Sequence, residues 1–498
     1  MSTPSPPSIS PSRRAAREAL HARFAQVERI GSPSQIALLS GFKRTWTEAE
    51  FAELWVEAVR RSGPTTVNNL YVHVPFCKSI CSFCNYERLR PTSPGALKDW
   101  RDRVLASIEV MGKAARGIRF HSLYFGGGTP SVPTAAMLGE VFTALDTHFA
   151  WHPKAGRAIE LDPAVMNPAK VAAMVEHGFE QFSFGVQSTR TDVNLAHNRG
   201  AQSPELIDRC LNLLPPPHEA KVTVDVLMGL AGTTPADTLA DLEMLLSHPR
   251  RPWVDLFHLT PTHSYVDSHY GGVRARADDA VAAYDQAFDD AVDALCEQHF
   301  YDTRRGGSHH CRTLVAARPT LPEGVRRLGV WSSEVRERWQ RWWTAKRAPR
   351  RMGRTAYCQV PTEVRAPLNL LGIGPSARSQ VFGLAMAQTR PHAGESGPTV
   401  YAGHPMQPID ELRTFVCFDV RDRGEVVDAH LEALFGMTLA EAMPEAVAVW
   451  QESGFARPTD TGWAFERGRP AEVARSLLWA VSDDHLEGII ARKNRRGR

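Results

Sequence analysis

The chain has 498 residues, of which 43% are hydrophobic, and a formal net charge of +3. That length is too great for one ordinary domain and suits a large α/β domain with appendages, while the small net charge excludes a molecule that attracts nucleic acid as a whole. No apolar stretch approaches the ~20 residues of a membrane-spanning helix, and the Ser/Pro run at residues 1–14 lacks the apolar core of a secretory signal. We therefore expect a cytoplasmic protein without a membrane or nucleic-acid partner, whose eight cysteines are reduced thiols.

In chain order, residues 1–25 are predicted to be a disordered lead-in and residues 26–69 a helical segment. From about residue 70, short apolar runs alternate with longer stretches of helical periodicity. Three predicted helices, Pro133–Phe149, Pro168–His177 and Pro235–Leu246, open on a proline, which suits the first turn of a helix. The six predicted strands are Leu70–Phe76, Ser122–Phe125, Ala158–Leu161, Gln181–Val186, Val222–Leu227 and Leu256–Thr260.

This alternation predicts right-handed βαβ units and a parallel sheet. Six such units over residues 70–299 predict an α/β fold that closes part of a barrel. In barrels of this kind chemistry collects at the C-terminal ends of the strands. Polar motifs that follow a predicted strand are therefore the candidates for a site.

Residues 300–357 break the alternation and are predicted to form an Arg/Trp-rich insertion or lid. We favour an amphipathic helix that packs its tryptophans on the barrel. Two alternatives stay open: a cap whose arginines pair with substrate carboxylates or phosphates while tryptophans stack on a ring, or a nucleic-acid surface. His309-His310-Cys311 is more simply a solvent-exposed loop than a haem or metal site. The tryptophans are Trp331, Trp339, Trp342 and Trp343.

Residues 358–408 are predicted to return to the barrel through the apolar, glycine-containing stretch Leu370–Ser379. Residues 409–498 are predicted to form a helical C-terminal domain with a hairpin around Pro458–Phe465. The basic run from Arg492 to the end is expected to be a solvated tail.

Three of the eight cysteines, Cys77, Cys81 and Cys84, follow the first predicted strand in C-x3-C-x2-C spacing. Thiolates ligate iron–sulfur clusters, and ordinary four-iron clusters take four of them. Three thiolates leave one iron open to chelate a small molecule, as a catalytic cluster needs. The alternative, a structural zinc site with His73 as fourth ligand, is disfavoured because His73 lies within the predicted strand and the spacing is unusual for zinc. We predict a 4Fe–4S cluster on these three cysteines, which are the candidate metal ligands and catalytic centre.

The segment around these cysteines resembles the radical S-adenosylmethionine (SAM) superfamily, with an aromatic residue, Phe83, before the third cysteine. The preceding Tyr71-Val-His-Val-Pro-Phe-Cys77 resembles the subfamily of oxygen-independent coproporphyrinogen III oxidases, which includes class C radical SAM methyltransferases and haem chaperones. The likeness runs from Leu70 to Pro261 and resumes at Leu371–Ser379. It implies a partial (β/α)6 TIM-type barrel and a winged-helix-like C-terminal domain.

A glycine-rich turn, Tyr124–Ser131, follows the second predicted strand, and glycines let backbone groups approach a ligand closely. Beside the cysteines this turn resembles the family loop that binds the amino group of the methionine moiety of SAM. In the resembled oxidase, positions like Thr129, Gln187, Arg199 and Asp225 hold a second SAM. The cofactor-binding residues that the resemblance implies are Tyr71, Phe83, Gly127, Gly128, Thr129, Glu160, Gln187, Arg199 and Asp225.

Asp225 interrupts the otherwise apolar run Val222–Leu230. A lone carboxylate inside a buried strand is costly unless it is paired, so we predict Arg199 as its partner. Related enzymes that do not use a second SAM can keep the same residues. These positions are therefore compatible with one SAM molecule or two.

The resemblance implies a mechanism in which SAM chelates the open iron and an electron from the reduced cluster cleaves a carbon–sulfur bond. The resulting 5′-deoxyadenosyl radical abstracts hydrogen from its target. In the oxidases that target is a propionate side chain, which then loses carbon dioxide. In class C methyltransferases it is the methyl group of the second SAM, whose carbon adds to an unsaturated substrate carbon. A flavodoxin or ferredoxin is the implied electron donor.

Two departures count against the oxidase reaction. Oxidases carry another cysteine where this chain has Tyr86, and an upstream Arg-Tyr-Thr-Ser-Tyr-Pro where it has Arg29-Ile-Gly-Ser-Pro-Ser. The haem-chaperone branch carries a His-Asn…Tyr-Trp stretch where this chain reads Gly353-Arg-Thr-Ala-Tyr-Cys-Gln-Val. We therefore favour methylation, or a related one-carbon addition, on a small, flat, unsaturated substrate, with oxidative decarboxylation and haem binding as the alternatives.

Overall fold

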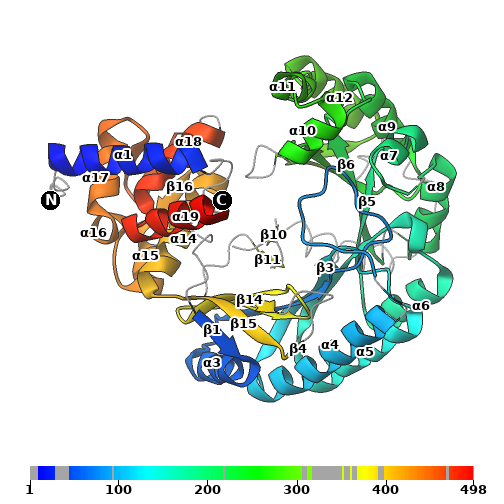
Figure 1. Cartoon of the computed structure of the whole chain (residues 1–498), viewed down its shortest axis with the longest axis horizontal. Coiled ribbons are helices and arrows are strands. Elements are labelled where there is room, and N and C mark those ends of the chain that lie inside the picture. The colour runs from blue at the N-terminus through cyan, green and yellow to red at the C-terminus, as the bar shows by residue number, and fades with distance from the viewer. Residues whose placement is uncertain are drawn as a thin grey trace, which may run out of the picture.

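The computed structural model describes residues 9–27, 44–91, 93, 95–200, 202–216, 219–305, 311–316, 350–352, 359–361, 367–390, 397–466 and 470–496. Within these residues one curved sheet of 13 strands forms the centre of the molecule (Figure 1). Neighbouring strands follow the order β1 (Arg44–Thr47), β15 (Val400–Pro405), β14 (Ala385–Arg390), β13 (Arg378–Val381), β12 (Leu368–Ile373), β2 (Val67–Val74), β3 (Arg119–Gly127), β4 (Ala150–Leu161), β5 (Gln181–Gln187), β6 (Lys221–Met228), β7 (Trp253–His258), β9 (Cys311–Ala316) and β8 (Tyr301–Arg305).

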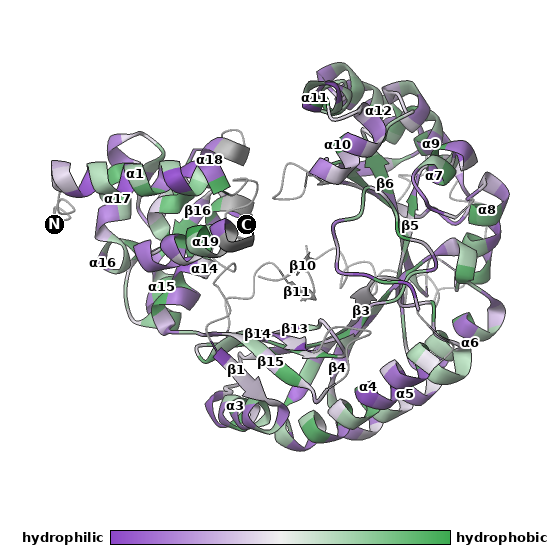
Figure 2. Cartoon of the chain, viewed as in Figure 1, coloured by the Kyte–Doolittle hydropathy of each residue, from purple (hydrophilic) through white to green (hydrophobic). Residues whose placement is uncertain are grey.

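Strands β2 to β7 are the six that the sequence predicts, and each pairs with the next in parallel, which confirms the βαβ units. The helices between them lie on the convex side of the sheet (Figure 1). Asn167 and Thr234 cap two of these helices, and a proline follows each cap, as predicted. Figure 2 shows hydrophobic residues on β5 and β6 and hydrophilic residues on α4. The connecting helices are α4 (Gly95–Ala114), α5 (Ala135–His148), α6 (Pro168–Glu176), α7 (Thr191–Ala196), α8 (Pro204–Leu213) and α9 (Pro235–Ser247).

The parallel part of the sheet extends beyond the prediction, because β12 pairs in parallel with β2. Asn369 donates from Nδ2 to Oδ1 of Asn68 at 2.9 Å across this pairing. Antiparallel strands continue the sheet from both edges: β13, β14, β15 and β1 on one side, β9 and β8 on the other. Since β1 and β8 are the two end strands, the described residues form a partial barrel that is not closed.

The prediction of an insertion or lid over residues 300–357 is wrong at its start. Residues 301–305 and 311–316 are the edge strands β8 and β9 of the main sheet, and Leu314 and Val315 are fully buried there. These residues become strands because β9 pairs with the edge of β7. Local composition does not reveal that pairing. The short strands β10 (Arg350–Met352) and β11 (Gln359–Pro361) pair with each other. The four tryptophans and His309-His310 lie outside the described residues.

The C-terminal residues form a mainly helical unit with its own apolar core, which includes Val416, Leu431 and Trp450. The predicted hairpin is present as β17 (Ala456–Thr459) and β18 (Gly462–Phe465), and β16 (Glu425–Val427) pairs with β18. The helices of this unit are α14 (Pro408–Arg423), α15 (Asp428–Phe435), α16 (Leu439–Ala442), α17 (Pro444–Glu452), α18 (Pro470–Leu477) and α19 (Asp483–Arg496).

The prediction of a disordered lead-in over residues 1–25 is wrong for residues 11–25, which belong to α1 (Pro11–Val27). This helix lies on the C-terminal unit (Figure 1), where Leu20 and Phe24 join an apolar cluster with residues of α19. The helix was missed because its apolar partners lie at the other end of the chain.

The remaining helices lie at the two edges of the curved sheet. Within the predicted helical segment 26–69, α3 (Glu48–Arg61) begins at a capping box formed by Thr47 and Glu50. The helices that follow β7 are α10 (His263–Tyr270), α11 (Arg274–Ala282) and α12 (Gln286–Gln298). In the part of the chain that the structure describes, no helix has the length and apolar character to cross a membrane.

Candidate active site

The three cysteines lie on one loop, residues 75–91, at the carboxyl end of β2. This cysteine loop is closed at its base, because Phe76 and Leu89 form a bridge and the Cys77 N–H donates to the Leu89 carbonyl at 3.0 Å. Further out, the Cys84 N–H donates to the Cys81 carbonyl at 3.2 Å. All three are partly exposed free thiols. The predicted ligands therefore stand together at the edge of the sheet where barrels of this kind place their chemistry.

Hydrogen bonds within the cysteine loop and from other elements hold the loop in place. Arg88 donates to the carbonyl of Cys84. The Ser82 hydroxyl lies 2.8 Å from Nε2 of His269 on α10, and the Ser82 N–H donates to the carbonyl of His197 at 3.0 Å. The protein itself thus fixes the loop conformation, so the thiols are positioned before any ligand binds.

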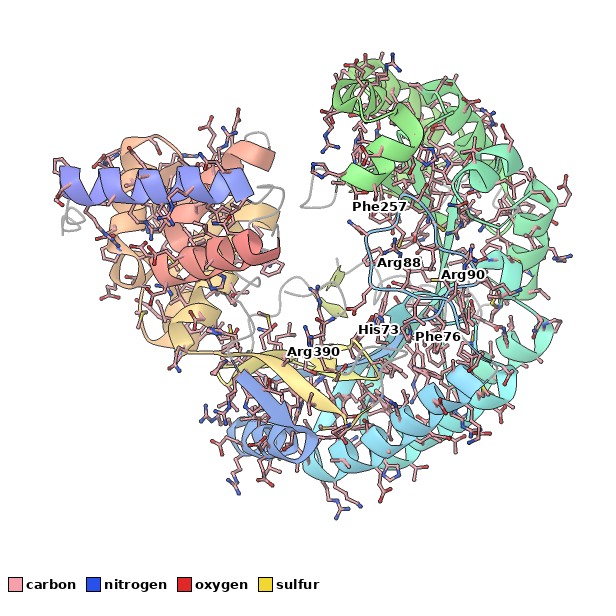
Figure 3. The ribbon with its side chains drawn as sticks, viewed as in Figure 1. His73, Phe76, Arg88, Arg90, Phe257 and Arg390 are labelled. Atoms are coloured by element: carbon pink, nitrogen blue, oxygen red, sulfur yellow. The ribbon has the colours of Figure 1, made fainter. Side chains whose placement is uncertain are left out.

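Charged and aromatic side chains gather near this loop. Figure 3 shows Arg88 and Arg90 of the loop, Phe257 of β7 and Arg390 of β14 around the inner side of the curved sheet, with His73 of β2 between them. These arginines and this phenylalanine therefore lie on the same inner side of the sheet as the cysteine loop.

Hydrogen-bond donors are directed at two of the three sulfurs. Thr129 Oγ1 donates to Cys77 Sγ at 3.5 Å, and Arg199 Nη1 donates to Cys81 Sγ at 3.7 Å. Burial raises the pKa of Cys77 to about 11 and also raises the pKa of Cys81, while these two donors lower the pKa values. Partly buried thiols that face donors are suited to bind a metal group, which takes them as thiolates and releases the protons.

These features fit a cluster better than a zinc ion. Zinc would need four ligands around one centre, and His73, the expected fourth ligand, has its Nδ1 2.7 Å from the Tyr71 hydroxyl. Among the described residues, no three His, Cys, Asp or Glu side chains converge on a position for one ion. A four-iron cluster takes each thiolate on a different iron, so it suits three sulfurs spread along one loop.

The glycine-rich turn at the end of β3 is packed against the base of the cysteine loop. Gly127 has a φ of +119°, and a Cβ there would lie 2.8 Å from the Val74 carbonyl oxygen. A Cβ on Gly128 would lie 2.7 Å from the Pro75 carbonyl oxygen. Close approach of the chain to itself therefore requires both glycines, in addition to the ligand approach that the sequence suggests.

Glu160, at the end of β4, lies beside this turn. Its carboxylate accepts from the Tyr124 hydroxyl at 2.7 Å and from the Gly127 N–H at 3.3 Å. Burial raises the pKa of Glu160 to about 6, against the lowering effect of those two donors. Tyr71 lies next to the Tyr124 ring. The structure thus brings together Tyr71, Gly127 and Glu160, which the resemblance implies for the first SAM. Tyr124 of the glycine-rich turn lies beside them.

The predicted pair between Asp225 and Arg199 is wrong. Asp225, on β6, accepts from the Ser183 hydroxyl at 3.2 Å. Arg199 instead donates to the Gly185 carbonyl and lies 3.5 Å from a carboxylate oxygen of Asp162. The chain turns back after α7 and directs the guanidinium group at the cysteine loop, so only its charge acts on Asp225, where it lowers the pKa.

The other implied residues lie at the same edge. Gln187 ends β5 with a φ of +71°, a costly conformation for a residue with a side chain. Phe83 packs near the His197 ring, with centroids 6.0 Å apart. Thr129 faces Cys77, as described above.

Sequence reasoning missed Asp255, which faces Asp225 across the β6–β7 pairing. The Thr313 hydroxyl donates to Asp255 at 2.5 Å, and burial raises the pKa of this carboxyl. Burial and the charge of Asp255 also raise the pKa of Asp225. The signal was available, because Asp255 interrupts an apolar strand as Asp225 does.

Comparison with known proteins finds a family match over part of the chain. The model of the radical SAM superfamily matches residues 71–245, which span the cysteine loop, the glycine turn, Glu160 and Asp225. This chain contains a radical SAM domain. The family implies a 4Fe–4S cluster and SAM, which agrees with the three thiols on the cysteine loop. The curated relatives of this chain confirm that its motifs resemble the coproporphyrinogen III oxidase-like subfamily.

Those relatives carry different names. The oxygen-independent coproporphyrinogen III oxidase of Paracoccus denitrificans is 28% identical over 39% of this chain and 42% of its own length. The anaerobilin synthase of Escherichia coli O157:H7 is 27% identical over 37% of this chain and 41% of its own length. The haem chaperone HemW of Synechocystis is 26% identical over 36% of this chain and 43% of its own length. The chain thus matches about two fifths of the length of each of these relatives.

The fold likeness is broader. The structure of Escherichia coli coproporphyrinogen III oxidase (HemN) superposes with a TM-score of 0.64 and covers 87% of this chain and 94% of its own, at 18% identity. The fold similarity to this structure therefore extends well beyond the residues matched by the radical SAM model.

Proposed function

We propose that this protein binds a 4Fe–4S cluster on Cys77, Cys81 and Cys84 and cleaves SAM reductively. The observation that carries this proposal is the closed cysteine loop beside Glu160 and the glycine turn within a radical SAM domain. When bound, the cluster would supply the electron that breaks a carbon–sulfur bond of SAM to give a 5′-deoxyadenosyl radical. Such a cluster suits the reducing cytoplasm expected from the cysteine usage.

The chain's own residues would bind and orient the first SAM. Glu160 keeps unused lone pairs beside its two donors and would accept hydrogen bonds from ribose hydroxyls. Gly127 and Gly128 would let the backbone meet the methionine moiety, with Tyr71 and Phe83 alongside. The curved sheet and the cysteine loop would keep water from the reacting atoms.

For the reaction we favour transfer of one carbon, with Thr129, Gln187, Arg199 and Asp225 binding a second SAM. Asp225 supports this, because a buried carboxylate with a hydroxyl donor can still bind a cationic or hydroxyl-bearing ligand. Tyr86, with 64% of its surface exposed, stands where the oxidases have a cysteine.

The substrate would be small, flat and unsaturated. Arg90 and Arg390 support an acidic substrate, since arginine pairs with carboxylates, and Phe257 offers a ring for stacking. A flavodoxin or ferredoxin would deliver the electron. The second candidate reaction is oxidative decarboxylation, which the fold likeness to HemN favours.

Product analysis separates these candidates. Anaerobically reconstituted protein is incubated with SAM, dithionite and either coproporphyrinogen III or haem. One-carbon transfer should release S-adenosylhomocysteine together with 5′-deoxyadenosine. Decarboxylation should release 5′-deoxyadenosine and carbon dioxide without S-adenosylhomocysteine. Iron-loaded protein that releases no 5′-deoxyadenosine under any of these conditions would contradict the proposal.

A haem-binding role would give another result. Haem would then bind tightly without SAM, and Cys84→Ala would retain that binding. Loss of haem uptake in this variant would speak against a delivery protein.

A further inference from the structure

We propose that Arg199 and Asp162 form an opposed charge pair that sets the reduction potential of the cluster, with Arg199 raising the potential and Asp162 lowering it. This inference rests on the proposed function, because it requires a cluster on the cysteine loop. It adds a role for Arg199 to the contact with a second SAM that is proposed above.

The contacts of Arg199 point to the cysteine loop. Only 10% of its side chain is exposed. Nη1 donates to Cys81 Sγ at 3.7 Å, and Nη2 donates to the Gly185 carbonyl and lies 3.5 Å from Asp162 Oδ2. With the amide of Gln202 turned to satisfy both of its polar atoms, Nε donates to that side chain at 2.8 Å. All three nitrogens of the guanidinium group are thus engaged by protein atoms.

Hydrogen bonds to neighbouring residues fix the positions of Asp162 and Arg199. Asp162 caps the turn after β4, where its Oδ1 accepts from the Ala164 N–H at 2.8 Å, and its own N–H donates to the Ser131 hydroxyl. Arg199 follows α7, and its N–H donates to the Asn194 carbonyl at 2.8 Å. Neither charge therefore needs to reorganise when the charge on a neighbouring group changes.

The physical consequence follows from charge. Reduction adds one negative charge to the cluster and its thiolates, and hydrogen bonds to the sulfurs and nearby charges set its potential. A cation and an N–H donor at Cys81 favour the reduced form, whereas a carboxylate disfavours it. Thr129 adds a neutral donor at Cys77.

The test measures the midpoint potential of the one-electron couple, with dithionite as reductant, in full-length reconstituted protein without SAM. The reduced cluster is followed by electron paramagnetic resonance. Arg199→Gln should shift the potential to more negative values, and Asp162→Asn to less negative values. Arg199→Lys, which keeps the charge, should shift it less than Arg199→Gln. Arg190→Gln is the matched control. Arg190 pairs with Asp192 and Asp237, as Arg199 pairs with Asp162, but it lies at the other end of α7, so the potential should not change.

Iron content separates the possible failures. Equal potentials, or shifts in the same direction, in iron-loaded Arg199→Gln and Asp162→Asn would overturn the inference, as would shifts that occur only when SAM is added. If Arg199→Gln binds no iron, Asp162→Asn and Thr129→Val test the inference in its place. The midpoint potential should become less negative in Asp162→Asn and more negative in Thr129→Val. If the wild-type chain binds no cluster, the proposed function itself is contradicted.

Discussion

Arg17 on α1 and Arg199 after α7 are both nearly buried, with 5% and 10% of their side chains exposed. Arg17 donates to the carbonyl oxygens of Leu478 and Val481 and pairs with Asp483, so it joins the first helix to the last. Arg199 meets a sulfur, a carboxylate and one carbonyl beside the cysteine loop. The acceptors, and not the burial, distinguish an arginine that holds the fold together from one that acts on a reacting centre.

The largest expected effect lies on the cysteine loop. Cys84→Ala should lose the cluster and lower SAM cleavage by at least about 100-fold, because it removes one of three ligands. Iron analysis and 5′-deoxyadenosine release measure this. Cys296→Ala, which removes a buried thiol of α12, should keep its iron. Full iron in Cys84→Ala would show that the ligand assignment is wrong.

At the α1 contact the effect should fall on stability alone. Arg17→Ala should lower the free energy of unfolding by about 3 kcal/mol, because it removes the donor to the buried Val481 carbonyl and one of the two arginine partners of Asp483. Urea denaturation measures the loss. The exposed pair of Arg14 with Glu452 serves as control, and Arg14→Ala should cost no more than about 1 kcal/mol. A change in the midpoint potential of the cluster in Arg17→Ala would contradict a purely structural role for Arg17.

Glu160 should give the active site a pH dependence. Burial raises the pKa of its carboxyl to about 6 from 4.5. The contribution of this group to stability is therefore fully present below pH 4.5 and is lost as pH rises through 6, by at most about 2 kcal/mol. Unfolding of the cluster-free chain at pH 4 to 8 tests this, and Glu160→Gln should remove the step. SAM affinity should change in the opposite direction and strengthen as Glu160 ionises. An identical pH profile in the variant would refute the assignment.

The smallest effect is expected at Asp255. Asp255→Asn should raise the free energy of unfolding at pH 8 by about 1 kcal/mol, because burial opposes the ionised form of Asp255 and its charge opposes ionisation of the facing Asp225. The amide oxygen can still accept from Thr313. Urea denaturation at pH 8 and at pH 4 measures the effect, which should vanish at the lower pH. Equal changes at both values would exclude a charge effect.

Much of the fold and site was predictable because the signals are local. Apolar runs of strand length, prolines after helix caps and the spacing of Cys77, Cys81 and Cys84 are written in short stretches of chain. The six parallel strands, the C-terminal hairpin and the shared edge of the cysteines and Glu160 all follow from them. The family resemblance then named the ligand chemistry.

Tertiary structure decided what depends on partners far along the chain. The pairing of β12 with β2, the edge position of β8 and β9, and the packing of α1 on α19 each join segments whose own composition leaves several partners open. Arg199 turned to Cys81 and Asp162 rather than Asp225, since the direction of a side chain is set by the path of the backbone around it. Sequence periodicity determines which residues can form an element. Three-dimensional pairing determines which charges and sulfurs meet.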